Sequence, residues 1–444
     1  MTTHFAAYLD DQDLIRMEGG ENVTAFLPFT LTSGSKAIEL LPTEEEKTLR
    51  SPLPIDMSQS YTLSNAKGET CLLHYRDIVR QPIFDQLYAY DGEDLGAHYS
   101  KEKTTFAFWA PISQEVELLI NQTTYPMERT EKGVWRLELE GDWEKASYYY
   151  QHQVNGVTHI VHDPYALSSE ANSGASYVID RHKIERPIQR ATTQLDPTQA
   201  IIYELSVRDF SMQKEAGFKH PGTFPALLES PKHGDQTFGF DYLKSLGITH
   251  VQLMPLYDFG SVDETNPTAG YNWGYDPVQY NVPEGSFSSQ PNDPYQRILE
   301  LQQVIDAYHE ANLSLIMDVV YNHVYLSDEF AFERIVPGYF YRYDQDRQRT
   351  NGTFCGNDVA SERAMVRNYI KQSVKQWVQL YGFDGFRFDL MGILDRQTMM
   401  EIQEELAAIY PNIYLYGEGW KMDTGLDPEL LAHQYNASQL RPYG

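Results

Sequence analysis

The sequence predicts two β-rich N-terminal regions followed by an α/β domain with a parallel sheet. Three observations support this prediction: the chain has 444 residues, its first part shows short strands between turns, and strands and helices alternate from about residue 198. This length exceeds that of one ordinary domain, so two or three domains are expected. Alternating strands and helices are typical of βαβ units, whose parallel strands are joined by right-handed crossovers.

The N-terminal part divides into two regions with different patterns of apolar and turn residues. Residues 1–86 contain short apolar runs broken by turns and indicate a small β-rich domain whose topology stays open. Residues 87–180 carry sharper strand signals at regular spacing, which favours a β-sandwich. Residues 181–198 are polar and are expected to form a linker to the domain over residues 199–444. The strongest predicted sandwich strands are 104–110, 115–120, 133–139 and 147–154.

The C-terminal part is expected to alternate between strands and helices. Asp293, Ser361 and Asp395 each precede an apolar-periodic stretch and are predicted to cap helices, because their side chains accept hydrogen bonds from free backbone N–H groups. A further short helix is predicted over 240–246. The sheet is compatible with an open sheet or with part of a closed barrel. The predicted strands are 200–207, 249–256, 313–320, 386–390 and 412–416.

Charge and composition exclude several classes of function. The chain has 35 basic and 63 acidic residues and a net charge of −28. Nucleic acids and anionic membranes are bound through basic surfaces, so neither is an expected partner, and a neutral substrate suits the chain. The N-terminus lacks the pattern of a signal peptide, and no run of about 18 apolar residues exists to span a membrane. The only cysteines, Cys71 and Cys355, suit a reducing compartment, so a cytoplasmic protein is expected.

Charged residues follow the predicted strands at their C-terminal ends. Arg387 and Asp389 end the fourth strand, and Glu418 follows the fifth. In parallel α/β folds these strand ends share one face, where catalytic residues collect. Two carboxyls about 5–5.5 Å apart are what a retaining glycosidase uses. Taken alone, an Arg–Asp pair is commonly a structural ion pair, so the convergence of all three residues on one face carries the interpretation.

Four segments resemble a known family. The segments DVVYNHV (318–324), GFRFDLMGI (385–393) and YGEGW (416–420) resemble the first three of the four signature regions of the α-amylase superfamily. The segment YNWGYDP (271–277) resembles the motif of the type I pullulanases within that superfamily. All four occur in family order and at natural spacing, and the resemblance covers nearly the whole chain.

The resemblance implies β-sandwich N-terminal domains followed by a (β/α)8 TIM-barrel-type catalytic domain, incomplete here with about five βα units. Residues 87–180 resemble the starch-binding-type β-sandwich that precedes such barrels. The family's fourth signature region, a His-Asp pair after the seventh strand, has no counterpart after Glu418. Residues 434–444 (QYNASQLRPYG) resemble the middle of a family sequence. We therefore expect a C-terminally truncated chain whose barrel does not close.

The same resemblance assigns roles to residues at the strand ends. It implies that Asp389 is the nucleophile, Glu418 the general acid/base and Arg387 the residue that orients the nucleophile. The other implied substrate-binding residues are His323, which hydrogen-bonds the glucosyl unit at the cleavage point, Tyr275, which stacks beneath it, Trp273 and Trp420, which shape the pocket, and Asp318, which supports Arg387.

The implied function is retaining endo-hydrolysis of α-1,6-glucosidic branch linkages in pullulan and branched α-glucans. Isoamylase-like or branching activity on the same scaffold is the alternative among enzymes, and a catalytically inactive glucan-binding fragment is the alternative without turnover. No organic cofactor is required. Calcium occurs in many relatives, bound partly through the residue matching Asn322, but the sequence shows no complete set of oxygen ligands. No G-x-G-x-x-G motif or P-loop supports a nucleotide site.

Overall fold

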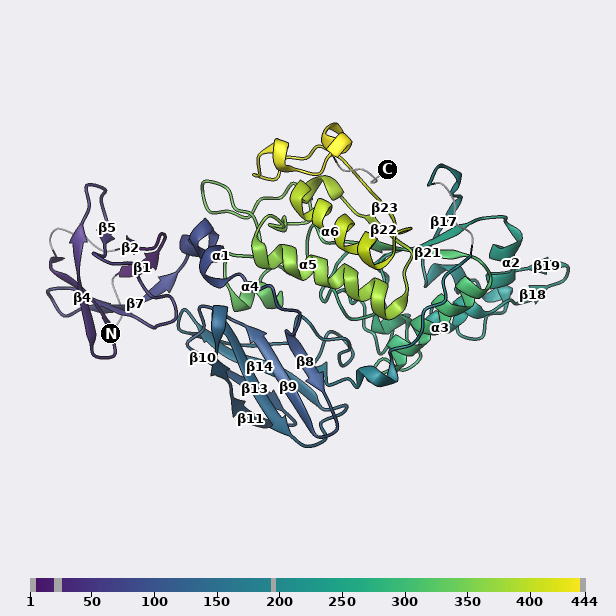
Figure 1. Ribbon diagram of the computed structural model, residues 1–444, viewed down its shortest axis with the longest axis horizontal. Helices are drawn as coiled ribbons and strands as arrows, with labels where there is room; N and C mark the ends of the chain where they lie inside the picture. Colours follow the sequence, from purple (N-terminus) through teal and green to yellow (C-terminus); the bar gives the residue numbers. More distant parts are fainter. Residues whose placement is uncertain (1–4, 20–25, 193–196, 440–444) are drawn as a thin grey trace.

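The computed structural model describes residues 5–19, 26–192 and 197–439. Three regions follow one another along the chain: a small all-β domain at one end, a β-sandwich, and an α/β domain that extends to the other end (Figure 1). Their buried hydrophobic side chains form one connected core. Residues 193–196 of the predicted linker and residues 440–444 of the predicted catalytic domain lie outside the described part of the chain.

The first domain is a closed barrel of short strands, which settles the topology that the sequence left open. β1 (Phe5–Leu9) pairs antiparallel with β2 and parallel with β7, and this parallel pair closes the barrel. Its residues alternate between the interior and the surface, as a strand with one buried face requires. The domain is therefore a barrel and not a two-sheet sandwich. Its order is β1, β2 (Leu14–Gly19), β5 (Thr48–Arg50), β4 (Lys36–Pro42), β3 (Phe29–Ser33), β6 (Thr62–Ser64) and β7 (Thr70–Tyr75).

The second domain is the predicted β-sandwich. Rings from its two sheets meet in the core, where Phe108 stacks on Tyr150 with their centroids 4.2 Å apart. The predicted strands 115–120 and 147–154 are found with the same bounds. One sheet contains β11 (Thr123–Pro126), β10 (Glu115–Ile120), β14 (Ser147–Val154) and β15 (Val157–Val161), with β16 (Ser176–Tyr177) also paired to β14, and the other contains β12 (Glu128–Arg129), β13 (Val134–Glu140), β9 (Lys103–Trp109) and β8 (Gly96–Tyr99).

The α/β domain contains a parallel sheet whose strands follow chain order. Most of these strands are shorter than predicted, because apolar runs continue past them into buried loops; Leu256 and Val320, for example, are buried beyond the ends of their strands. The strands are β17 (Ile202–Leu205), β20 (His250–Leu253), β21 (Ser314–Val319), β22 (Gly385–Phe388) and β23 (Tyr414–Gly417), and a small hairpin adds β18 (Lys232–His233) and β19 (Gln236–Thr237).

The helices of this domain only partly follow the predicted caps. Asp395 caps α6 as predicted, since its side chain accepts a hydrogen bond from a backbone N–H in the first turn. Asp293 also accepts from two backbone N–H groups, but α3 itself begins later, at Gln296. The prediction for Ser361 is wrong, because α5 begins at Ala364 and the Ser361 hydroxyl accepts from the backbone of Asp395. The helices are α2 (Gly239–Ser245), α3 (Gln296–Glu310), α4 (Ala331–Ile335), α5 (Ala364–Gln376), continued by a π-helical turn (Trp377–Tyr381), and α6 (Arg396–Ile409).

Two arginines of the segment between the sandwich and the α/β domain form ion pairs with the α/β domain. Arg186 forms an ion pair with Asp306 of α3 at 2.7 Å. Arg190 forms one with the buried Asp384, just before β22, at 2.9 Å. The described part of the predicted linker therefore lies against the α/β domain.

The N-terminal barrel is also attached to the α/β domain. The short helix α1 (Pro82–Tyr88) carries Asp85, which accepts a hydrogen bond from the backbone N–H of Ala364 at 3.0 Å. Arg347 forms ion pairs with Asp10 at 3.2 Å and with Asp77 at 2.9 Å. These contacts join the first and third domains directly.

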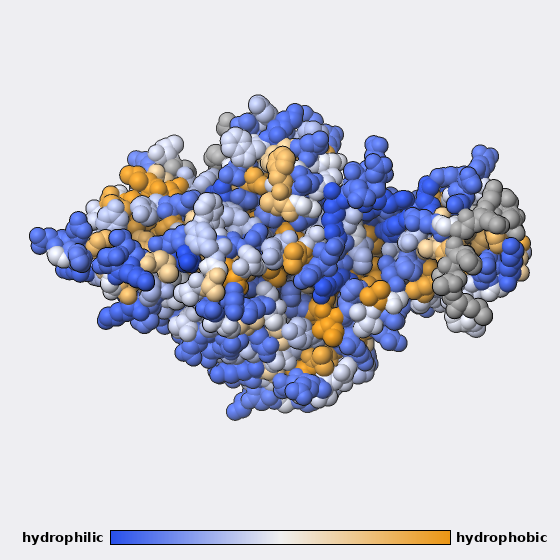
Figure 2. All heavy atoms as spheres, turned by 180° about the vertical axis from the view of Figure 1, so that it is seen from behind, coloured by the Kyte–Doolittle hydropathy of each residue, from blue (hydrophilic) through white to orange (hydrophobic). Residues whose placement is uncertain are grey.

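The surface agrees with the acidic, polar composition. Viewed from behind, it is mainly hydrophilic, and apolar side chains gather only in separate patches (Figure 2). Within the described ranges, no helix combines the length and the apolar character that crossing a membrane requires.

One buried carboxyl lies where the sandwich passes toward the α/β domain. Asp163 is 1% exposed and accepts hydrogen bonds from the Tyr148 hydroxyl at 2.7 Å and the Tyr165 backbone N–H at 2.8 Å. Burial raises the pKa of Asp163 from 3.8 to about 6. Folding therefore favours the protonated form, so this group contributes stability below about pH 4 and loses that contribution as the pH rises through about 6.

Replacing Asp163 with asparagine should remove this pH dependence. We expect the free energy of unfolding of the unmodified chain, relative to Asp163→Asn, to fall by roughly 2 kcal/mol between about pH 4 and about pH 7. The full difference for a shift of roughly two pKa units, about 3 kcal/mol, is reached only at lower pH. Chemical denaturation at a series of pH values measures this difference. Asp11→Asn, which changes an exposed carboxyl, is the control and should show no such trend. A difference for Asp163→Asn that stays constant with pH would contradict the assignment.

Candidate active site

Two carboxylates lie side by side where the last two strands of the sheet end. β22 and β23 pair in parallel with Phe388 opposite Gly417, so the next residues, Asp389 and Glu418, follow at the same level. The ladder continues past the strand ends, because the backbone N–H of Glu418 donates to the carbonyl oxygen of Phe388 at 3.0 Å. The structure thus places both predicted acids at the C-terminal edge of the sheet.

One guanidinium connects the two acids. Nη1 of Arg387 lies 3.0 Å from Oδ1 of Asp389, and Nη2 lies 2.5 Å from Oε1 of Glu418. Nη1 also lies 2.9 Å from Oδ1 of Asp318 on β21. The Arg387 side chain is only 15% exposed, so solvent screens these charges weakly. Because the guanidinium is planar and rigid, it holds three carboxylates in one arrangement.

Asp318 supports this guanidinium from within the sheet. It is fully buried, and its Oδ2 accepts hydrogen bonds from Arg387 at 3.0 Å and from the Tyr275 hydroxyl at 2.9 Å. Burial raises the pKa of Asp318 to about 7, and the Arg387 charge opposes that shift. Burial and the Asp318 charge also raise the pKa of Tyr275, which keeps its hydroxyl protonated as a donor. Tyr275 therefore connects the YNWGYDP loop to the centre of the site.

Asn322 and His323 hold the other side of Asp389. The Asn322 amide donates to Oδ2 of Asp389 at 3.0 Å and to its carbonyl oxygen at 2.7 Å. Nδ1 of His323 lies 2.6 Å from Oδ1 of Asn322, and Nε2 lies 2.8 Å from the carbonyl oxygen of Tyr275. Both ends of the Asn322 amide are thus engaged within the site. Both ring nitrogens of His323 already have partners, so one of these hydrogen bonds must break before His323 can bond to a sugar.

Glu418 has different surroundings from Asp389. Its side chain is 32% exposed, whereas that of Asp389 is 12% exposed. Oε2 of Glu418 accepts from the backbone N–H of Leu390 at 3.1 Å, and Leu390 adopts a left-handed φ of 40° that turns the chain after β22. Gly417 allows the close approach of these segments, because a Cβ there would lie 2.8 Å from a carbonyl oxygen of β22. Lack of space for a side chain thus explains the glycine at position 417, the first of the YGEGW segment.

The predicted tryptophans lie at the rim of the site. Trp273 is 58% exposed and Trp420 is 56% exposed. The Trp273 indole N–H donates to the hydroxyl of Tyr271, which itself donates to Asp209 at 2.6 Å. These bonds fix the edge of the Trp273 ring and leave an exposed flat surface of the kind that aromatic side chains offer to ligands.

Sequence reasoning missed the segment over residues 351–358. Phe354 in this segment is 83% exposed and has a left-handed φ of 61°. Its neighbour Cys355 lies near enough to Asp389 that burial and this carboxylate together raise the pKa of the thiol. Asp358 fixes the turn by accepting from two backbone N–H groups at 2.8 and 2.9 Å. The available signal was the glycine-containing run NGTFCGN, which indicates a turn but not that the turn lies near Asp389.

A second cluster of carboxylates lies in the α/β domain. Among the described residues, Asp258, Glu264 and Glu284 are buried and bring carboxylate oxygens within 4.8 Å of one another, as ligands of a hard cation do. Arg297 donates to Glu264 at 3.1 Å and supplies one positive charge to this cluster. Burial and the Glu264 charge raise the pKa of Asp258, and raise that of Glu284 to about 8. Arg297 and protonation therefore offset much of the negative charge.

Two known families match parts of the chain. Residues 94–166 match carbohydrate-binding module 48 (isoamylase N-terminal domain), within the β-sandwich. Residues 237–349 match the alpha amylase catalytic domain and include β20, β21 and the YNWGYDP loop. The sandwich and the parallel sheet thus each match a family of carbohydrate-related proteins.

Individual relatives cover the chain more completely. Pullulanase of Bacillus subtilis (strain 168) is 36% identical over 99% of this chain and 63% of its own length. The crystal structure of pullulanase from Anoxybacillus sp. LM18-11 complexed with maltotetraose superposes with a TM-score of 0.93 and 39% sequence identity. The match covers 99% of this chain and 65% of that chain. The structure of pullulanase from Paenibacillus barengoltzii in complex with maltohexaose and alpha-cyclodextrin has 43% sequence identity and a TM-score of 0.81. This match covers 83% of this chain and 59% of that chain.

The chain spans less than two thirds of the length of each of these relatives. It shares with them the sandwich, the parallel sheet and the order of the domains. By sequence and structure, the chain belongs to the type I pullulanases of the α-amylase superfamily.

Proposed function

We propose that the chain carries the active site of a retaining hydrolase that cleaves α-1,6-glucosidic branch linkages within pullulan and branched α-glucans. The observation that carries this proposal is the bridge from Arg387 to both Asp389 and Glu418. Retaining glycosidases use two carboxyls about 5–5.5 Å apart, whereas inverting enzymes separate them by about 6.5–9.5 Å to admit a water molecule. Two carboxylates bound to one guanidinium favour the shorter arrangement.

Asp389 acts as the nucleophile. Its carboxylate attacks the anomeric carbon while the bond from that carbon to the 6-oxygen of the neighbouring glucose breaks, which gives a covalent glycosyl-enzyme. Arg387 and Asn322 each donate to one carboxylate oxygen of Asp389, which fixes the direction of this carboxylate. Water then replaces Asp389 at the anomeric carbon, and the two displacements together retain its configuration.

Glu418 acts first as the general acid and then as the base. It gives its proton to the leaving 6-oxygen and later takes a proton from the attacking water. Oε1 of Glu418 is held by Arg387, so the acid step requires this carboxyl to separate from the guanidinium when substrate enters. Its partial exposure leaves room for that movement.

An α-glucan substrate is supported by the site and by the relatives. The exposed faces of Trp273 and Trp420 offer surfaces on which the C–H faces of glucose can pack. We propose that Tyr275 stacks beneath the glucosyl unit at the cleavage point and that His323 hydrogen-bonds to it. The solved relatives bind maltotetraose, maltohexaose and alpha-cyclodextrin, which are α-glucans. A net charge of −28 suits a neutral polymer.

Other readings of the same site lead to different products. Isoamylase-like or branching activity would use the same carboxylates, and a glucan-binding fragment would bind without turnover; the segment YNWGYDP favours pullulanase. A cytoplasmic location and independence from cofactors stay predictions.

Incubation of the purified chain with pullulan tests the proposed reaction. We expect maltotriose as the main product, and we expect Asp389→Asn to lower its rate of release by at least about 10³-fold, because an amide does not form the covalent intermediate. Glu418→Gln should lower it strongly as well, since the amide cannot donate the acid's proton. Chromatography of the products measures both effects.

Asp346→Asn, which changes an exposed carboxyl away from the site, is the matched control and should leave the rate unchanged. Release of maltotriose that survives Asp389→Asn would overturn the assignment of the nucleophile. Pullulan binding without release would favour the glucan-binding alternative, and debranching of glycogen without action on pullulan would favour the isoamylase-like one.

Arg387→Lys tests the bridge itself. A lysine ammonium cannot hold three carboxylates in fixed directions, so we expect kcat on pullulan to fall by roughly 10²-fold with a smaller change in KM. Steady-state kinetics, with an unfolding curve to check the fold, make the measurement. Arg50→Lys changes an arginine that pairs with Asp13 in the first domain, outside the bridge, and should leave kcat unchanged. Equal effects of the two substitutions would show that the bridge has no special role.

A further inference from the structure

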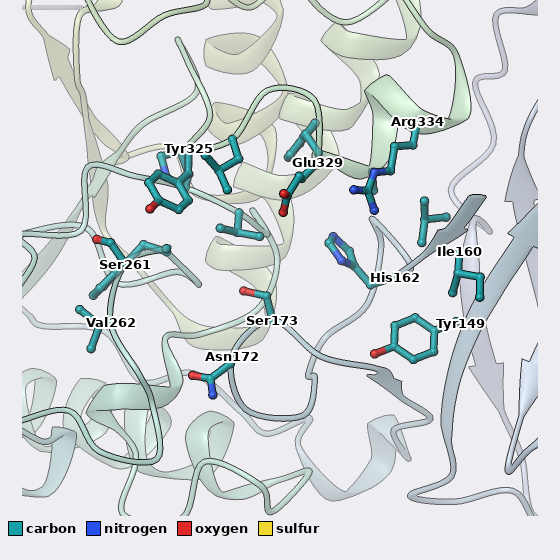
Figure 3. Close-up of a pocket in the computed structure, with 18 of the residues that line it drawn as sticks. Tyr149, Ile160, His162, Asn172, Ser173, Ser261, Val262, Tyr325, Glu329 and Arg334 are labelled. Atoms are coloured by element: carbon teal, nitrogen blue, oxygen red, sulfur yellow. The ribbon is translucent and has the colours of Figure 1, made fainter. Parts of the chain in front are cut away.

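A cavity of about 550 Å³ lies between the β-sandwich and the α/β domain. None of the residues assigned above to catalysis lines it. Its walls come from β14, β15 and the chain that follows β15 on the sandwich side, and from the loops after β20 and β21 and helix α4 on the other (Figure 3). Sites for small molecules have about this volume and often lie between domains.

Two opposite charges face this cavity, and neither forms an ion pair with another described residue. Arg334 of α4 donates only from Nε to the carbonyl oxygen of Asp328 at 3.3 Å, and among the described residues no carboxylate forms an ion pair with it. Glu329 is exposed, and its carboxylate has no hydrogen-bond or ion-pair partner within the described chain. Figure 3 shows both side chains turned toward the same space, with His162 of the sandwich opposite Arg334.

The remaining groups favour a neutral ligand with many hydroxyls. Burial, together with the Arg334 charge, lowers the pKa of His162 to about 4, so its neutral ring offers one donor and one acceptor. Tyr149 and Tyr325 add aromatic rings at opposite sides of the cavity, and their hydroxyls form no hydrogen bond within the described residues. An anion would meet Glu329 and a cation would meet Arg334, whereas a sugar uses donors and acceptors together.

The cavity and the candidate active site share a wall. The Tyr325 ring lies directly on Gly260, where a Cβ would come within 2.1 Å of it, and Tyr325 follows His323 by two residues. Asn272, next to Trp273, donates to the carbonyl oxygen of Gly260 at 3.0 Å. The loop that carries the rim tryptophan on one side thus forms part of the cavity on the other.

We propose that this cavity is a second binding site for a neutral α-glucan segment, built jointly by the sandwich and the α/β domain. The inference rests on the proposed function, because the substrate of a debranching enzyme is a polymer whose chains extend beyond one active site. A segment bound in the cavity keeps such a polymer beside the loop that leads to Trp273. The sandwich module then contributes to binding through its contact with the α/β domain.

Calorimetric titration with maltohexaose tests this site. The Asp389→Asn chain is used throughout so that no turnover occurs. We expect two classes of binding, and we expect Arg334→Ala and Tyr149→Ala each to weaken one class by at least about 10-fold while the other class is unchanged. Arg181→Ala, which removes an exposed arginine outside the cavity, is the matched control and should change neither class. Unfolding curves of all variants establish that each is folded.

Hydrogen exchange locates the binding. Maltohexaose should protect residues 157–161 and 331–335 in the Arg181→Ala control and not in Arg334→Ala. One binding class that neither cavity variant affects, or absence of protection in these segments, would overturn the second site while leaving the proposed hydrolysis intact. If the cavity class is lost in both variants, and the chain that retains Asp389 fails to hydrolyse pullulan in a separate assay, the result would support the site and count against the proposed function.

Discussion

The Arg387 guanidinium is the group on which the arrangement of the site depends. It contacts Asp318, Asp389 and Glu418, which lie on or just after three neighbouring strands. Without a cation between them, these carboxylates would repel one another. The fully buried Asp318 accepts hydrogen bonds from the guanidinium and from the hydroxyl of Tyr275, which fixes Asp318 in turn. The guanidinium is thus held from one side, and the two acids on the other side keep a constant distance from each other.

Predictions from the sequence were correct where the position of a residue along a strand determines which residues lie next to it. Arg387 and Asp389 are two positions apart, so they share one face of β22, and the structure brings them to 3.0 Å. The bounds of β10 and β14 were predicted because aromatic and β-branched residues are interrupted there by clear turn signals. The alternation of strands and helices likewise indicated the parallel sheet, whose strands the structure places in chain order.

Other features depend on contacts between segments that are distant in the chain, which no local pattern encodes. The parallel pairing of β1 with β7 closes the first domain, and either strand alone is compatible with a sandwich. Ser361 has a capping residue type, but its hydroxyl binds the backbone of Asp395. The place of Cys355 near Asp389 follows from the path of a long loop. The interdomain cavity arises only when the sandwich meets the α/β domain.

The stereochemistry of the first product tests the central claim most directly. The bridge through Arg387 holds Asp389 and Glu418 as a close pair, which supports a covalent intermediate and two inversions at the anomeric carbon. Proton NMR during early turnover of pullulan distinguishes the anomers of the newly released reducing end before they interconvert. The α-anomer as first product is the result that this mechanism predicts. The β-anomer as first product would mean a single displacement by water and would contradict it.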